Sequence, residues 1–94
     1  MFILRIEHPV RDFDGWKEAF DRDPLGREKM QVKQYRVIRP VDNADYVTVD
    51  LEFETTAQAE TMLQALRGLW NRIPADFVMS PRTRIFEIIE SDKY

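Results

Sequence analysis

The sequence contains no cysteine and only one histidine, His8. The absence of cysteine excludes disulfide bonds, thiolate metal sites and a cysteine nucleophile. The chain also has no glycine-rich phosphate loop, no Ser-His-Asp grouping and no metal-ligand spacing. We therefore expect no metal site. Cysteine-dependent enzymes, Ser-His-Asp hydrolases and enzymes with a glycine-rich phosphate loop are excluded.

Long basic runs and long apolar runs are missing as well. The formal net charge is -3, so we expect no nucleic-acid partner. No apolar segment approaches the roughly 20 residues that a membrane helix needs. The N-terminal segment contains Arg5 and Glu7 within a strand pattern, which is not typical of a signal peptide. We expect a cytoplasmic protein, which the lack of cysteine also favours.

What is present suits one globular domain over residues 1–94. Hydrophobic residues make up 44% of the chain and charged residues 33%. A domain of this size has a modest core. No linker or low-complexity segment divides it.

A strand–helix–strand pattern occurs twice, over residues 1–39 and 46–90. Period-two alternation predicts strands at 2–8, 32–39, 46–54 and 83–90. The first helix should start at an Asp12 N-cap, break near Pro24 and Gly26, and resume briefly over 27–30. The second helix opens with Thr55 and Gln58, spaced as a capping box, and ends before residue 74.

This order predicts an α+β, ferredoxin-like βαββαβ fold. The four strands should form an antiparallel sheet in the order fourth, first, third, second, with both helices on one face. The other face is either solvated or paired with a second copy. We expect Ile85 or Ile89 to be exposed there in a monomer. Polar side chains also point to that face: Arg5, Glu7, Gln34, Arg36, Thr48, Asp50 and Glu52.

Three segments resemble small proteins of the dimeric α+β barrel superfamily: residues 8–20 (HPVRDFDGWKEAF), 35–40 (YRVIRP) and 47–53 (VTVDLEF). This superfamily includes antibiotic biosynthesis monooxygenase-like domains and haem-degrading monooxygenases. The resemblance implies a homodimer whose two sheets close into a barrel, with ligands held between helices and sheet. Haem-degrading members use an axial histidine around or after the second helix, and this chain has none there. We expect no cofactor.

His8 is the candidate catalytic residue. It should lie on the helix-facing side, at the end of the first strand. There it is either a general base or a polar anchor at a pocket mouth, or a histidine that caps local backbone or is half exposed. Aromatic and sulfur-containing side chains are candidates for binding a small apolar or aromatic ligand, although helical spacing is also typical of plain core. These candidates are Trp16, Phe20, Tyr35, Trp70, Phe77 and Met79.

Three functions remain open at this point. The first is a monooxygenase-like or cyclase-like enzyme that needs no cofactor and acts on an aromatic or polyketide-type molecule. The pair Trp70-Asn71 resembles the aromatic and amide residues of cofactor-free oxygenases. The second is a small-molecule binding module without catalysis, and the third is a structural dimer domain. A cavity beside His8 would discriminate between them.

Overall fold

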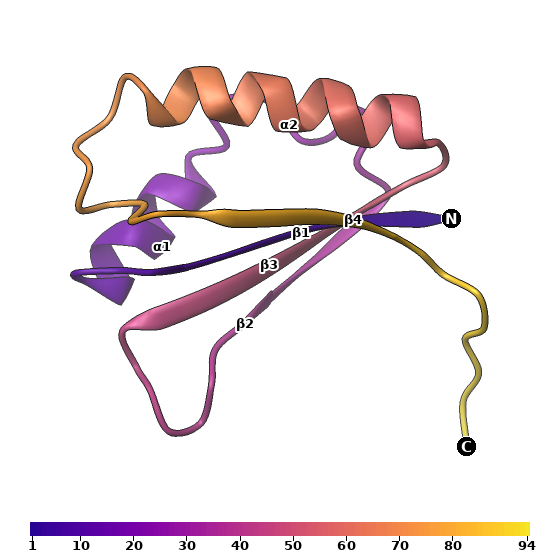
Figure 1. Ribbon diagram of the computed structural model, residues 1–94, viewed down its shortest axis with the longest axis horizontal. Coiled ribbons are helices and arrows are strands. Elements are labelled where there is room, and N and C mark those ends of the chain that lie inside the picture. Colours follow the sequence, from indigo (N-terminus) through magenta and orange to yellow (C-terminus); the bar gives the residue numbers. More distant parts are fainter.

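Both helices lie on one side of the sheet and leave its other face uncovered (Figure 1), and side chains along the first strand alternate between the two faces. The computed structural model describes residues 1–94. The elements are β1 (Phe2–Pro9), α1 (Phe13–Asp21), β2 (Gln34–Ile38), β3 (Tyr46–Phe53), α2 (Thr56–Trp70) and β4 (Arg82–Glu87). All strand pairs are antiparallel in the order β2-β3-β1-β4, which confirms the predicted ferredoxin-like arrangement. Neither helix is long and apolar enough to cross a membrane.

The helix-covered face carries the core. Leu4, Ile6 and His8 of β1 are buried there, and Phe53 of β3 has no exposed surface. Burial of apolar side chains is the main favourable term in folding, at about 25 cal/mol per Å². Only 12 of the 94 residues are buried, so the core is small.

The two helices begin differently. At α2, the Thr55 side chain accepts from the Gln58 backbone N–H and the Gln58 side chain accepts from the Thr55 N–H, which confirms the capping box. At α1, Asp12 occupies the N-cap position, but its side chain makes no capping hydrogen bond. The expectation that its carboxylate accepts first-turn amides is wrong, although the carboxylate lies close to Gly15, where a Cβ would be 2.9 Å from Oδ2.

The segment between α1 and β2 contains turns instead of a second helical piece. α1 ends at Asp21, and Asp23 follows with a φ of 52°. Gly26 and Gln31 also have positive φ, at 73° and 72°. Residues 27–30 themselves form hydrogen-bonded turns, and the positive φ of Gly26 and Gln31 on either side prevents a right-handed helix from extending past them, so the predicted helical piece over 27–30 is wrong.

The uncovered face contains a different set of apolar residues from the one expected. Ile85 lies opposite Leu4 in the sheet and packs against the core, so the expectation that it is exposed is wrong. Phe86, 39% exposed, takes that place on the uncovered face opposite Ile3. Ile89 is 84% exposed, as expected, beyond the end of β4. Figure 1 shows this tail leading away from the sheet.

The charged residues of the uncovered face lie in register across the strands. Arg5 of β1 is opposite Asp50 of β3 and Arg84 of β4, and Arg36 of β2 is opposite Asp50. Nε and Nη2 of Arg5 each donate to Asp50 at 2.8 Å. The same guanidinium lies over the Phe86 ring, 5.4 Å from its centroid. This face therefore combines charge with exposed aromatic surface.

Candidate functional site

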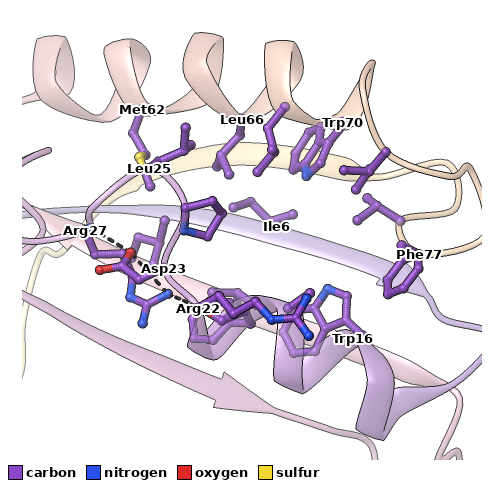
Figure 2. Close-up of a pocket in the computed structure, with 18 of the residues that line it drawn as sticks. Ile6, Trp16, Arg22, Asp23, Leu25, Arg27, Met62, Leu66, Trp70 and Phe77 are labelled. Atoms are coloured by element: carbon purple, nitrogen blue, oxygen red, sulfur yellow. Dashed lines mark hydrogen bonds and ion pairs between the residues drawn. The ribbon is translucent and has the colours of Figure 1, made fainter.

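A cavity of about 290 Å³ lies between the two helices and the sheet (Figure 2). Ligand pockets in proteins span roughly 300–1,000 Å³, so this one is at the small end. Its walls come from β1, α1, the α1–β2 segment, β3, α2 and the loop after α2. Apolar side chains predominate: Met62, Leu66, Leu69 and Trp70 from α2, Trp16, Ala19 and Phe20 from α1, and Ile6, Val49 and Leu51 from the sheet.

One wall is formed by the rings of His8, Trp16 and Phe20, and the row of rings continues beyond the cavity to Tyr35. The centroid of His8 is 6.0 Å from that of Trp16, in an edge arrangement. Trp16 stacks on Phe20 one helical turn later, at 5.3 Å and an interplanar angle of 24°. Phe20 in turn meets Tyr35 of β2 edge-on at 5.4 Å. These offset and edge arrangements are the ones aromatic rings prefer, so the wall is well ordered.

His8 is the titratable group in this row. It is 2% exposed, and its Nδ1 lies 2.9 Å from the backbone carbonyl oxygen of Pro9. Because a carbonyl oxygen only accepts, Nδ1 carries the proton and Nε2 holds the free lone pair. Burial lowers the pKa of His8, and the Pro9 carbonyl partly opposes that shift. The imidazole is therefore neutral at pH 7.

The opposite end of the row is charged. Arg27 lies over the rings of Phe20 and Tyr35, at 4.1 and 4.7 Å from their centroids. Its Nη1 donates to the Phe20 carbonyl oxygen at 2.9 Å, and its backbone N–H donates to Asp23 Oδ1 at 2.8 Å. Arg22, Asp23 and Arg27 all line the cavity. Figure 2 shows Asp23 and Arg27 at one end of the cavity and Phe77 at the other.

The loop between α2 and β4 borders the cavity at the Phe77 end. Phe77 and Val78 line the cavity. Asp76 fastens this loop to the β1–α1 connection, since Arg11 Nη1 donates to its carboxylate at 2.8 Å. The arginine lowers the pKa of Asp76, which in turn raises that of Arg11. Both side chains are exposed, so the pair positions the loop and contributes little stability.

The candidate residues are placed as follows. The cavity is lined by His8, Trp16, Phe20, Trp70 and Phe77. Tyr35 shares the helix-covered face but lies behind Phe20, outside the lining. Met79 is 39% exposed and also outside it. Asn71 caps the C-terminus of α2 and does not line the cavity.

Sequence reasoning missed the charged residues of the cavity. Arg22, Asp23 and Arg27 lie beside Pro24 and Gly26, and in the sequence these two residues predict only a break in the helix. The sequence did contain one indication of their position: a chain reversal after α1 returns these side chains to the open end of the helix-covered face. No group of three or more His, Asp or Glu side chains is placed to hold a metal ion.

Comparison with known proteins identifies the fold and no more. No protein-family model matches the chain, and no curated protein matches it. Among solved structures, it is similar to a dimeric ferredoxin-like protein from an uncultured marine organism, with a TM-score of 0.63 and 12% sequence identity. The match covers 96% of this chain and 97% of that one. At this identity the likeness establishes a shared ferredoxin-like fold.

Proposed function

We propose that this chain is a homodimeric protein of the dimeric α+β barrel type that binds a small apolar or aromatic molecule in the cavity of each subunit. The observation that carries the proposal is the cavity itself, lined mainly by apolar side chains with His8 and the charged end as its polar groups. Apolar concavities with few polar groups are the usual small-molecule sites. Protein interiors are normally close-packed, so we would expect side chains to fill this space in a purely structural dimer.

Binding can be tested by a ¹H–¹⁵N shift titration with 2-naphthalenemethanol, a neutral aromatic probe. We expect saturable shifts at His8, Trp16 and Phe77, which line the cavity. Shifts confined to Asp50 and Glu52 would place the ligand on the uncovered face and contradict the proposal.

The homodimer is proposed from the uncovered sheet face. Phe86 and Ile38 are 39% and 43% exposed there, in rows that also carry charge. Four arginines and three carboxylates share the face, so two copies would meet without strong net repulsion. They are Arg5, Arg36, Arg82 and Arg84, with Glu7, Asp50 and Glu52. The structurally similar marine protein is described as dimeric, which supports the proposal.

Light scattering at micromolar concentration tests the dimer. We expect twice the 11.2 kDa mass of one chain, since stable interfaces bury about 1,200–2,000 Å². Phe86→Asp should convert the protein to monomer, because it places a charge where apolar surface would be buried. Gln64→Glu, which adds the same charge on the exposed side of α2, should leave the dimer intact. A wild-type mass of one chain would refute the proposal.

A second candidate is catalysis at the same site, of the monooxygenase-like or cyclase-like kind. The observation that favours it is the buried neutral His8, whose Nε2 is able to accept a proton from a phenol or an acidic C–H. An anthrone-type substrate under oxygen tests this candidate. Oxygen uptake above the protein-free rate, lost in His8→Gln while binding persists, would support it. Uptake equal to the protein-free rate would contradict it.

A further inference from the structure

We infer that the cavity selects an anionic amphiphile: an aromatic or aliphatic carboxylate whose head binds Arg27 at the charged end and whose apolar body lies between α1 and α2. The inference rests on the proposed ligand binding and specifies the ligand class. Its basis is the uneven distribution of charge around one cavity. Both cavity arginines belong to the segment that follows α1, and the remaining walls are apolar apart from His8.

Arg27 is held in place by contacts that leave much of its hydrogen-bonding capacity unused. Its stacking on Phe20 and Tyr35 and its bond to the Phe20 carbonyl fix the guanidinium plane. A guanidinium has five N–H donors, and that bond engages one nitrogen. The nearest carboxylate oxygen, on Asp23, is 3.6 Å from Nη1, too long for a good hydrogen bond. The remaining donors can therefore bind an acceptor supplied by a ligand.

The charge balance at this end is positive. Arg22 makes no ion pair within the chain. Asp23 is the single carboxylate among the lining residues, and it is occupied by the Arg27 backbone N–H. The Arg27 side chain is only 16% exposed, so water screens it incompletely. A carboxylate head would add the missing negative charge at a site where arginine can bind it bidentately.

The far end of the cavity limits the rest of the ligand. His8 is neutral, and its ring contacts that of Trp16. Trp16 lies one helical turn before Phe20, which is at the arginine end of the row of rings. Figure 2 shows Leu66, Trp70 and Ile6 between the two ends. A second charge on the ligand would be desolvated there without a partner, at considerable cost. With a volume of about 290 Å³, the cavity suits an acid with one or two rings.

The test compares 2-naphthoate with 2-naphthamide, which has nearly the same shape and no charge, by shift titration of the full chain. We expect naphthoate to bind at least roughly ten-fold more tightly, as charge-assisted hydrogen bonds predict. Arg22→Gln removes the second positive charge of the cavity lining and should reduce the preference for naphthoate. Lys29→Gln removes an equal charge from the same segment outside the cavity and should change neither affinity.

Two further variants provide separate readouts, so the test does not depend on the correct folding of any one variant. Arg27→Lys keeps the charge but loses the flat bidentate donor, so naphthoate should weaken more than naphthamide. Asp23→Asn retains an acceptor for the Arg27 N–H and removes the only negative charge, so naphthoate should bind more tightly. Equal affinity for the two probes would overturn the inference while leaving ligand binding in place. Failure of both probes to bind would instead overturn the proposed binding function and, with it, this inference.

Discussion

The imidazole of His8 lies edge-on to the indole of Trp16, with ring centroids 6.0 Å apart, and this contact joins β1 to α1 inside the cavity wall. The hydrogen bond from Nδ1 to the Pro9 carbonyl fixes the ring from the other side. A histidine held in this way has one defined tautomer and little access to water. The pKa of His8 therefore depends on how completely this cavity wall is shielded from water.

The first prediction concerns the pKa of His8. Because burial disfavours the imidazolium form, we expect a folded-state midpoint below the ordinary value of about 6.5. His8 is the only histidine, so a single Cε1–H resonance followed by NMR from pH 4 to 8 gives the value without assignment. A midpoint at or above 6.5 would contradict the burial seen here.

The same shift makes stability depend on pH. Below about pH 6.5 the unfolded chain binds a proton at this histidine that the folded chain does not, so the free energy of unfolding falls as pH drops towards the folded pKa, then levels off. Urea unfolding of wild type and His8→Gln at fixed protein concentration isolates this contribution. The wild type should lose more stability than the variant between pH 7 and pH 5; equal losses would count against it.

The second prediction compares a residue that lines the cavity with a residue of the packed core. Leu66 lines the cavity and is partly buried, so Leu66→Phe should fill free space, change thermal stability little and weaken the binding of either naphthalene probe. Leu4 is fully buried, so Leu4→Ala should cost about 2–5 kcal/mol. Thermal denaturation and shift titration of both variants provide the comparison. Strong destabilisation by Leu66→Phe would mean that the space is not truly open.

The third prediction concerns the ion pair of the uncovered face. Asp50 is 9% exposed and accepts two hydrogen bonds from Arg5. Asp50→Ala should cost about 1–3 kcal/mol, less than a fully buried pair because the Arg5 side chain is 41% exposed. Asp21→Ala removes the exposed partner of Lys17 and should cost under about 1 kcal/mol. Equal costs in urea unfolding would show that the Arg5–Asp50 geometry adds nothing.

The fourth prediction tests the start of α2. Thr55→Ala removes the acceptor for the Gln58 backbone N–H and should lower stability by about 1 kcal/mol. Thr61→Ala is the matched control, because that hydroxyl donates to Ala57 within the helix. Alanine has the higher helix propensity, so this variant should be neutral or slightly stabilising. The reverse order of the two stabilities would refute the capping role.

The sequence predicted the sheet well because period-two alternation and proline positions act locally. The assignment of Thr48, Asp50 and Glu52 to the uncovered face and the Thr55–Gln58 cap depend on residues close together in the chain, and both are confirmed. The same alternation placed His8 on the helix-facing side, but its nearly complete burial was not predicted. Ile85 was misplaced because β4 has apolar residues on both faces, so its register with β1 decided the outcome.

The charged end of the cavity could not be predicted from local patterns. Asp23 and Gln31 adopt positive φ, which is uncommon for residues other than glycine. The path of this segment is fixed by contacts between parts of the chain that periodicity does not relate, such as Arg27 with Tyr35. The place of Arg22 and Arg27 in the same cavity lining as side chains of α2 depends on that path.

The order of the strands also affects how copies of the chain can associate. β2 and β4 are the edge strands, with unpaired backbone groups that another strand could extend. Both are short, and they carry Arg36, Arg82 and Arg84. Like charges on two approaching edges oppose the growth of one continuous sheet from chain to chain. These edge arginines therefore disfavour fibre-like aggregation, while the broad face between the two edges stays open to a partner.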